Sequence, residues 1–371
     1  MMNTVNSTAT QVKLDPTLKC PRVQTFELEL SKKVIGQKRS ISSLARVYQV
    51  YCANMNDRTR PIANMMLMGP TGVGKTKTVE AAAEVLFGKK NAVVKINCAE
   101  FQHSHEIAKL VGSPPGYLGH RETSPFLTQD RLEENFTADN KLVFVLFDEI
   151  EKASDALWTI MLGIMDKGSL RLGTNQQVSF SNSIIVMTSN LGAKEMSNMI
   201  NGHIGFAPTN QHNQYHDGSE LDQKIYHTAL AAAKRKFLPE FMNRLDKIVV
   251  CRSLHTDQLR EILDLELMDI QEMIYDNSII QISFECTNKC KEFLLSEGTD
   301  LQYGARMLRR TLDKYLIAPI AKLMDSHQVE SEDHILIDKD PGDRRLIFQK
   351  IPKIHSTGCG TVIKKLLLKK Q

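Results

Sequence analysis

The stretch Gly69-Pro70-Thr71-Gly72-Val73-Gly74-Lys75-Thr76 matches the phosphate-binding pattern G-x-x-x-x-G-K-[ST], and it decides the expected fold. It follows an apolar run, 64–68, and opens a helical segment, which is the strand–loop–helix context that this pattern requires. Glycines let such a loop curl until its backbone N–H groups point at phosphate oxygens, and the helix N-terminus adds positive potential. We therefore expect all eight residues to cradle ATP, with the Lys75 ammonium on the β and γ phosphates and the Thr76 hydroxyl on Mg²⁺. A chance glycine-rich turn is the alternative, but it does not explain why the complete pattern lies between an apolar strand and a helix.

A second motif ends another apolar run, Leu142-Val143-Phe144-Val145-Leu146-Phe147, with two carboxylates, Asp148 and Glu149. A buried strand would place both carboxylates at the carboxyl edge of a parallel sheet, beside the P-loop. We expect Asp148 to hold Mg²⁺ through water and Glu149 to orient and polarise the attacking water. A solvated strand end is the alternative, and the P-loop upstream favours the catalytic interpretation.

The order of strands and helices predicts an α/β protein. Short apolar strands alternate with amphipathic helices from Val34 to about Arg252, which is typical of a parallel sheet flanked by helices. The predicted strands are 64–68, 92–97, 142–147, 183–188 and 247–251. We expect a flexible leader at 1–30, a large ATPase domain at 31–252, a small helical domain at 253–340 and a basic tail at 341–371.

The small domain is predicted from a change of periodicity after Ser253. Two long helices are expected there, with short strands near 279–284 and 334–337. The apolar positions of the two helices recur at helical spacing: Leu259, Ile262, Leu263, Leu267 and Ile270 in the first, and Leu308, Leu312, Leu316, Ile320 and Leu323 in the second. The basic tail carries eight lysines and arginines. A solvated tail and a contact with an anionic partner both remain open for it.

Composition limits the class of protein. The chain has 371 residues, a net charge of +4 and 24% charged positions, so bulk charge alone does not indicate nucleic-acid binding. Its longest apolar runs are far shorter than the roughly 18 residues of a membrane helix, and its N-terminus has no apolar core of a signal peptide. The seven cysteines form no C-x-x-C pair. Together these features predict a cytoplasmic protein without a membrane partner.

With both nucleotide motifs in place, the sequence resembles the Clp family of AAA+ unfoldases. The resemblance is to the second nucleotide-binding domain of ClpA, ClpB and ClpC and covers about 34–337. Val34-Ile35-Gly36-Gln37 resembles the segment that packs on adenine, which implies contacts from Val34 and Ile35, and Arg60-Pro61-Ile62 leads into the P-loop as in the family.

Three further family motifs imply roles around the γ-phosphate. Thr188-Ser189-Asn190-Leu191-Gly192 resembles sensor 1, so Asn190 is expected to contact the γ-phosphate or the attacking water. Pro239-Glu240-Phe241-Met242-Asn243-Arg244 resembles the arginine-finger box, which implies that Arg244 reaches the nucleotide of a neighbouring subunit. Gly304-Ala305-Arg306 resembles sensor 2, with Arg306 on the nucleotide of its own subunit. Arginine suits both positions because it is permanently charged and carries a rigid fork of donors.

The segment Gly112-Ser113-Pro114-Pro115-Gly116-Tyr117-Leu118-Gly119 resembles the substrate-gripping pore loop of the family. Glycines on both sides free the loop, and Tyr117 presents an apolar surface to a passing chain. A Pro-Gly turn with a packed tyrosine is the alternative. The sequence departs from the family pattern at two places that bear on the threading of a substrate chain. His120 replaces an aromatic residue that is frequent in the family. The segment 168–180, which is similar to a second pore loop, has Leu172 and Ser179 where acidic residues are usual.

A polar insertion between Gly192 and Asp222 contains Ile204-Gly205-Phe206. ClpA, ClpC and ClpX carry a similar tripeptide that docks into the ClpP peptidase, whereas ClpB lacks it. The resemblance therefore implies a ClpP-like peptidase as a partner that binds this tripeptide. A tripeptide that forms a buried strand end is an equal alternative.

The resemblance implies a single-ring, hexameric ATPase that unfolds or remodels misfolded proteins with Mg²⁺ and ATP. Two other readings stay open. ATP could control assembly without threading, in which case Tyr117 is dispensable, or the basic tail could serve a nucleic-acid-associated AAA+ protein, in which case DNA binding should depend strongly on salt.

Overall fold

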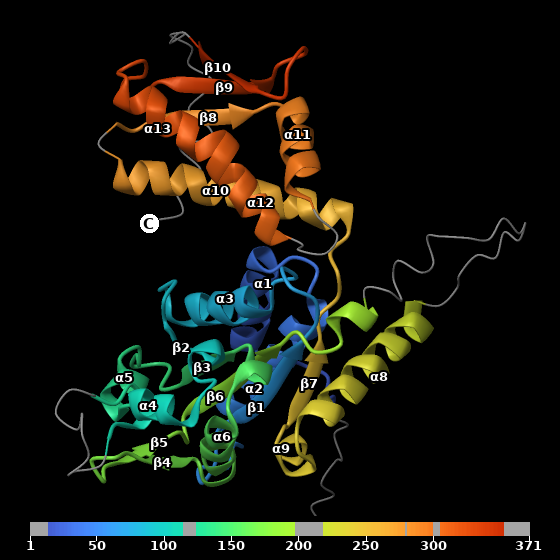
Figure 1. The fold of residues 1–371 in the computed structure, drawn as a ribbon, viewed down its shortest axis with the longest axis vertical. Helices are drawn as coiled ribbons and strands as arrows, with labels where there is room; N and C mark the ends of the chain where they lie inside the picture. The colour runs from blue at the N-terminus through green and yellow to red at the C-terminus, as the bar shows by residue number, and fades with distance from the viewer. Residues whose placement is uncertain (1–13, 114–123, 197–217, 279, 300–304, 352–371) are drawn as a thin grey trace, which may run out of the picture.

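The computed structural model describes residues 14–113, 124–196, 218–278, 280–299 and 305–351. A central parallel sheet has the strand order β2-β3-β6-β1-β7 (Figure 1). Its strands are β1 (Ala63–Met68), β2 (Val93–Asn97), β3 (Val143–Asp148), β6 (Ser183–Ser189) and β7 (Lys247–Val250). The predicted α/β class is confirmed, and each end of the five predicted strands lies within one residue of the observed end.

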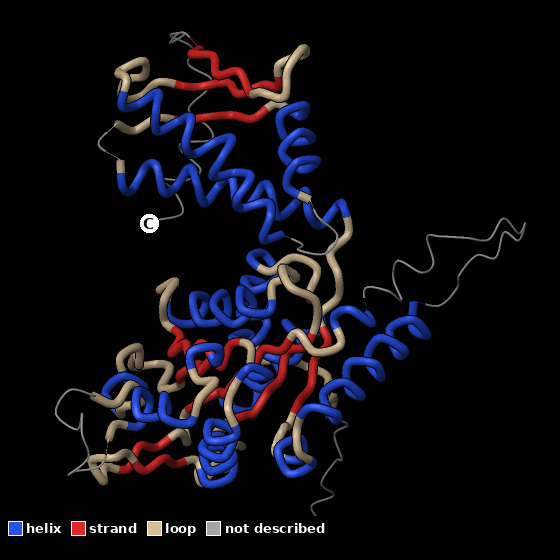
Figure 2. The backbone as a smooth tube through the Cα atoms, in the orientation of Figure 1, coloured by secondary structure: helices blue, strands red, loops and turns tan. Residues whose placement is uncertain are grey.

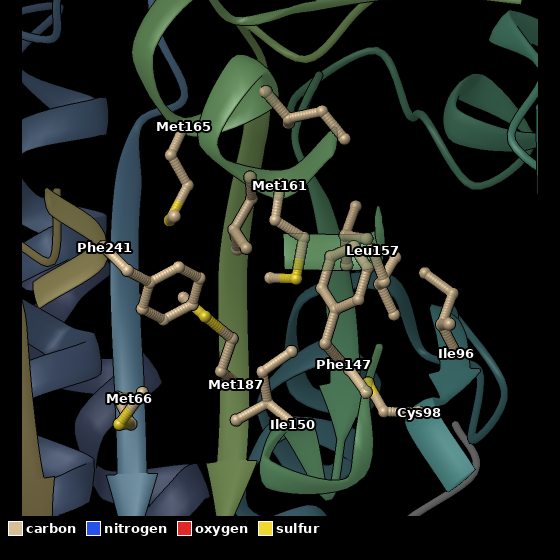
Figure 3. Packing of buried hydrophobic residues seen from close by; sticks show 14 of the residues in the cluster. Met66, Ile96, Cys98, Phe147, Ile150, Leu157, Met161, Met165, Met187 and Phe241 are labelled. Carbon is tan, nitrogen blue, oxygen red and sulfur yellow. The ribbon is translucent and has the colours of Figure 1, made fainter. Parts of the chain in front are cut away.

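The three inner strands β1, β3 and β6 are buried on both faces, which explains why they are almost entirely apolar, whereas the edge strand β2 alternates between buried and exposed residues. Met65 and Leu67 of β1 pack into one apolar cluster, and the alternate residues Met66 and Met68 pack into another. Figure 3 shows the second cluster, in which Met66 of β1 and Met187 of β6 share one apolar core with Met161, Met165 and Phe241. Side chains that alternate between two cores fix the register of each strand.

Helices cover both faces of this sheet. One face carries α1 (Pro21–Lys33), α2 (Lys38–Cys52) and α3 (Lys75–Phe87), and the other carries α6 (Asp155–Lys167), α8 (Gly218–Lys236) and α9 (Pro239–Asn243). Shorter elements follow β2 and α6: η1 (Cys98–Glu100), η2 (Ser104–Ile107), α4 (Ala108–Val111), α5 (Gln129–Glu133), η3 (Ile150–Lys152) and the hairpin β4 (Ser169–Arg171) with β5 (Gln177–Ser179). Among the described residues, no helix is long and apolar enough to cross a membrane.

The C-terminal region has its own apolar core. Figure 2 shows its helices and strands grouped apart from the central sheet. The region contains α10 (Thr256–Asn277), β8 (Ser283–Cys286), α11 (Asn288–Gly298), α12 (Ala305–Leu312), the π-helical η4 (Asp313–Ile317), α13 (Ala318–Asp325), β9 (His334–Lys339) and β10 (Leu346–Ile351). Leu308, Leu312, Leu316 and Ile320 are buried along α12, η4 and α13, as their spacing predicts. The three strands form a sheet in the order β10-β9-β8.

The predicted flexible leader at 1–30 is wrong for its last third. Helix α1 begins at Pro21, and Val23, Phe26 and Leu30 are buried against α2 and α3. These apolar positions are separated by polar residues, so the helical stripe is too narrow to stand out in the sequence. Residues 1–13 lie outside the described part of the chain.

The predicted basic tail at 341–371 is also wrong where it begins. Residues 346–351 form β10, which pairs antiparallel with β9. Lys350, counted among the tail cations, contacts the buried carboxylate of Asp333 at 2.6 Å. The small domain therefore extends past residue 340, and residues 352–371 lie outside the description.

Candidate active site

The P-loop connects the carboxyl end of β1 to the start of α3. Gly69 has a φ of +147°, and a Cβ there would lie 2.7 Å from the carbonyl oxygen of Cys251, so only glycine fits. Gly74 precedes α3 with a φ of +95°, which turns the chain into the helix. The backbone N–H groups of 71–75 donate to no acceptor in the part of the chain that the structure describes. This row of free donors at a helix N-terminus fits an anion.

The Lys75 ammonium lies buried under this loop. It donates to the carbonyl oxygens of Gly69 and Pro70 at 2.8 and 2.7 Å and to Asn190 Oδ1 at 2.7 Å. Burial lowers the pKa of Lys75, and neighbouring thiol and carboxylate groups oppose that shift. An ammonium has three donors, so a bound phosphate must replace one of these contacts.

Asp148 is the last residue of β3 and Glu149 follows it, and both carboxylates act electrostatically on the Lys75 ammonium. Thr76 Oγ1 donates to Asp148 Oδ1 at 3.1 Å, which places the two expected magnesium ligands together. Glu149 has a φ of +59°, an unusual left-handed conformation for a non-glycine residue. Such strained residues concentrate at functional sites. The left-handed turn directs Glu149 Oε1 to the Asn190 amide, 3.3 Å away.

Sequence reasoning missed three residues of this polar network. Thr188 Oγ1 donates to Asp148 Oδ1 at 2.5 Å and accepts from the Glu149 N–H, so it holds the Asp148 carboxylate and the backbone of Glu149. Glu151 Oε1 accepts from the Asn190 N–H at 3.1 Å, while its Oε2 is buried with no partner among the described residues. Lys152 pairs with Glu149 at 2.6 Å, and this bond raises the Lys152 pKa. Thr188 is the first residue of the quoted sensor 1 motif, and Glu151 and Lys152 lie just after Asp148-Glu149, so nearness to the named residues was the available signal.

The expected adenine segment is fastened to the P-loop by Gln37. Its Nε2 donates to the carbonyl oxygens of Val73 and Arg252, and its Oε1 accepts from the Arg252 N–H. Val34 is buried in the same cluster as Val73, and Ile35 is half-buried. The segment therefore ties the P-loop to the connection that leads into α10.

Arg306 lies at the start of α12, next to the P-loop. The Ala305 N–H donates to the carbonyl oxygen of Gly72 at 3.1 Å, which joins the small domain directly to the loop. The Arg306 side chain is exposed and acts electrostatically on Lys152. This placement fits a cation that meets nucleotide bound by its own chain.

Arg244 lies far from its own P-loop. It follows α9 and precedes β7, at the amino edge of the sheet, whereas Lys75 lies at the carboxyl edge. The six residues of β1 between the edges span roughly 16–20 Å. Arg244 Nη1 pairs instead with Asp166 Oδ1 at 2.9 Å, and both side chains are more than 40% exposed. The structure does not bring Arg244 to the other site residues of its own chain.

Two predicted contacts lie outside the described residues, namely Tyr117 and the tripeptide at 204–206. The stem of the Tyr117 loop is described: Phe126 and Leu127 N–H groups donate to the carbonyl oxygens of Lys109 and Leu110. The Gly173 N–H, in the turn between β4 and β5, donates to Val111 at 2.7 Å. The stem of the Tyr117 loop is thus bonded to the β4–β5 turn of the segment that resembles a second pore loop.

The residues at the carboxyl edge fit a magnesium-bound nucleoside triphosphate. Free N–H donors and Lys75 suit phosphate oxygens, and the Thr76 hydroxyl with Asp148 suits Mg²⁺, which prefers oxygen ligands. Mg²⁺, when bound, would neutralise negative charge on the phosphates. Glu149 and Asn190 lie where they could hold a water molecule.

Comparisons with known proteins agree with this geometry. Residues 60–248 match a family described as "AAA domain (Cdc48 subfamily)", and residues 254–337 match the "C-terminal, D2-small domain, of ClpB protein". Chaperone protein ClpB 1 of Thermosynechococcus vestitus is 35% identical over 88% of this chain and 34% of its own length. The negative regulator of genetic competence ClpC/MecB of Bacillus subtilis is 33% identical over 87% of this chain and 37% of its own.

A cryo-EM reconstruction of Hsp104 with ATPγS and FITC casein shares the fold, with a TM-score of 0.71 and 24% identity. The match covers 89% of this chain and 52% of the Hsp104 chain. The chain spans about a third of the length of the curated relatives that it matches. The two family matches together cover most of the residues from the P-loop approach to β9, and the chain therefore belongs to the Clp branch of the AAA+ ATPase family.

Proposed function

We propose that this protein is a ring-forming ATPase, expected to be hexameric, that uses ATP hydrolysis to unfold or remodel proteins. One observation carries the proposal. The carboxyl edge holds Lys75, Asp148, Glu149 and Asn190 in one connected network, whereas Arg244 lies at the opposite edge. A chain built this way has most of a site and an arginine that only another copy can use.

In the proposed reaction, each residue has a separate task. The N–H groups of 71–75 and Lys75 would hold the phosphates, while the Thr76 hydroxyl and, through water, Asp148 would hold Mg²⁺. Glu149 accepts the proton of the attacking water, and Asn190 keeps the Glu149 carboxylate and that water in line. Arg306 of the same chain and Arg244 of a neighbour stabilise the negative charge that develops on the γ-phosphoryl group.

A protein substrate is proposed from the loop around Tyr117. Backbone hydrogen bonds between 109–110 and 126–127 close the stem of this loop. A further hydrogen bond from Gly173 N–H joins the stem to the β4–β5 turn. A loop held at its base can transmit force from the ATPase domain to a bound chain. Two relatives that are 35% identical to this chain carry the name chaperone protein, ClpB 1 and ClpB2, which supports a protein substrate.

The testing experiment measures ATP turnover with and without an unfolded polypeptide, together with the mass of the particle. We expect an oligomer whose turnover rises when casein is added. A monomer with full turnover at all concentrations would contradict the shared site.

Tyr117→Ala separates a protein remodeller from an assembly switch. The change removes the proposed substrate contact and leaves the phosphate site intact. Basal ATP turnover should therefore survive, while unfolding of a tagged protein should fall about tenfold or more if several subunits grip together. Unfolding retained by Tyr117→Ala would refute threading.

A further inference from the structure

Asn64 is a buried amide in the first part of the central strand β1. Its side chain is fully buried, and it precedes the apolar run Met65–Met68. Burying an amide costs free energy unless its polar atoms are paired. Its Oδ1 has no hydrogen-bond partner within the described part of the chain, so an apolar residue would be the less costly choice for packing alone.

The Asn64 amide group joins the segment that carries Arg244 to the end of α6. Asn64 Nδ2 lies 3.2 Å from the carbonyl oxygen of Arg244 and 3.4 Å from that of Met165. The next residue after Met165 is Asp166, which pairs with the Arg244 guanidinium at 2.9 Å. The buried Asn64 side chain therefore contacts both segments that meet at this ion pair, namely the end of α6 and the segment that carries Arg244.

The backbone of Asn64 holds the same segment. Its N–H donates to Asp246 Oδ2 at 2.7 Å, and the Asp246 N–H donates back to its carbonyl oxygen at 2.9 Å. Arg60 pairs with the other oxygen of Asp246 at 2.8 Å. These backbone contacts survive a change of the Asn64 side chain, so the amide can be tested while the segment stays attached.

We infer that Asn64 is a positioning residue for Arg244, which it holds at the angle needed to reach the nucleotide of a neighbouring subunit. The inference rests on the proposed shared site. A rigid amide contact at the Arg244 carbonyl limits rotation of the backbone from which the guanidinium projects. Displacement of a reacting group by about 1 Å can cost up to a hundredfold in rate, so a buried anchor matters even though it touches no substrate.

Mixed rings locate the effect of Asn64. The reference mixture combines Glu149→Gln subunits with Arg244→Ala subunits, because only a site with intact Glu149 beside a donor of intact Arg244 can turn over. In the first test, Asn64→Leu is added to the Glu149→Gln subunit, which donates the arginine. In the second, it is added to the Arg244→Ala subunit, which supplies the site. We expect ATP turnover to fall about tenfold in the first mixture and to stay within twofold of the reference in the second.

Other outcomes overturn the inference in distinguishable ways. Equal loss in both mixtures means that Asn64 serves only folding, and no loss in either means that the amide does not position Arg244. A reference mixture no more active than its parents refutes the shared site itself, and the role of Asn64 falls with it. Asn64→Ser, which keeps a donor, repeats the comparison if Asn64→Leu folds poorly. Ser183→Ala is the matched control, since Ser183 is buried at the same edge without a partner for its Oγ among the described residues and should be neutral in both mixtures.

Discussion

The two edges of the central sheet differ in how their polar groups are satisfied. At the carboxyl edge, Lys75, Asn190, Glu149 and Asp148 bond to one another or to groups beside them, and Lys75 is buried. At the amino edge, the backbone around Arg244 is anchored by buried groups, but its guanidinium is exposed and paired only with Asp166 among the described residues. The first edge is arranged to receive a ligand, and the second is arranged to present a side chain outward.

This difference supports the proposed shared site, in which one subunit supplies only part of the hydrolytic machinery. Groups that bind phosphate and water are fixed by the chain itself, because strand ends of a parallel sheet converge at one edge. In the proposed shared site, the completing charge comes from Arg244 of a neighbouring subunit, so hydrolysis would depend on assembly. The predictions for Glu149, Arg244 and Asp166 test one edge against the other, and the prediction for Gly173 tests the stem of the Tyr117 loop.

The largest expected effect is at the carboxyl edge. Glu149→Gln removes the base but keeps the size of the side chain and its contact with Asn190, so ATP should bind with near-normal affinity and turn over at least about a hundredfold more slowly. Lys75→Ala is the contrasting variant, because it removes a phosphate donor and should weaken binding itself. Nucleotide affinity and turnover are measured on the same preparations. Unchanged turnover in Glu149→Gln would exclude Glu149 as the base.

The next effect tests the amino edge. Arg244→Ala should retain nucleotide affinity, because Arg244 is remote from its own P-loop, and should lose turnover by about tenfold to a thousandfold. Lys236→Ala, which removes a cation from the neighbouring end of α8, is the control and should keep turnover. Weak nucleotide binding by Arg244→Ala would place the arginine in its own site and remove the distinction between the two edges.

The carboxyl edge was predictable from sequence because its chemistry is local. The P-loop and Asp148-Glu149 each occupy consecutive positions at the end of an apolar run, so motif and strand identify each other. The contacts of Arg244 were not predictable, because Asn64 and Asp166 are single polar residues more than 75 positions away in the chain. Only folding brings β1, α6 and the start of β7 together. The same reason hides α1, whose three buried residues matter only once α2 and α3 are in place.

The contact between the stem of the Tyr117 loop and the β4–β5 turn gives a third test. Gly173 has no room for a side chain, since a Cβ would lie 2.5 Å from the Gly112 carbonyl oxygen. Gly173→Ala should therefore displace the stem of the Tyr117 loop and reduce unfolding of a tagged protein about threefold to tenfold, with smaller change in basal turnover. Gly163→Ala is the control, because a Cβ there meets nothing within 4 Å. Equal losses of unfolding and turnover would show that the β4–β5 turn serves the ATPase domain as a whole.

The smallest effect concerns the ion pair between Arg244 and Asp166. Both side chains are more than 40% exposed, and exposed ion pairs contribute about 0–1 kcal/mol. The pair nevertheless competes with the neighbour's nucleotide for the same guanidinium, so Asp166→Asn should free the arginine and raise turnover by up to about threefold. Salt screens exposed charges, with a Debye length near 10 Å at 0.1 M, so the gain should shrink as ionic strength rises. Turnover of Asp166→Asn and the unmodified protein is compared across a salt series, with Asp155→Asn as a control for the loss of one acidic residue from α6. A tenfold loss at every salt concentration would mean that Asp166 holds Arg244 in its working position, and the carboxylate would then belong with Asn64 among the groups that position the arginine.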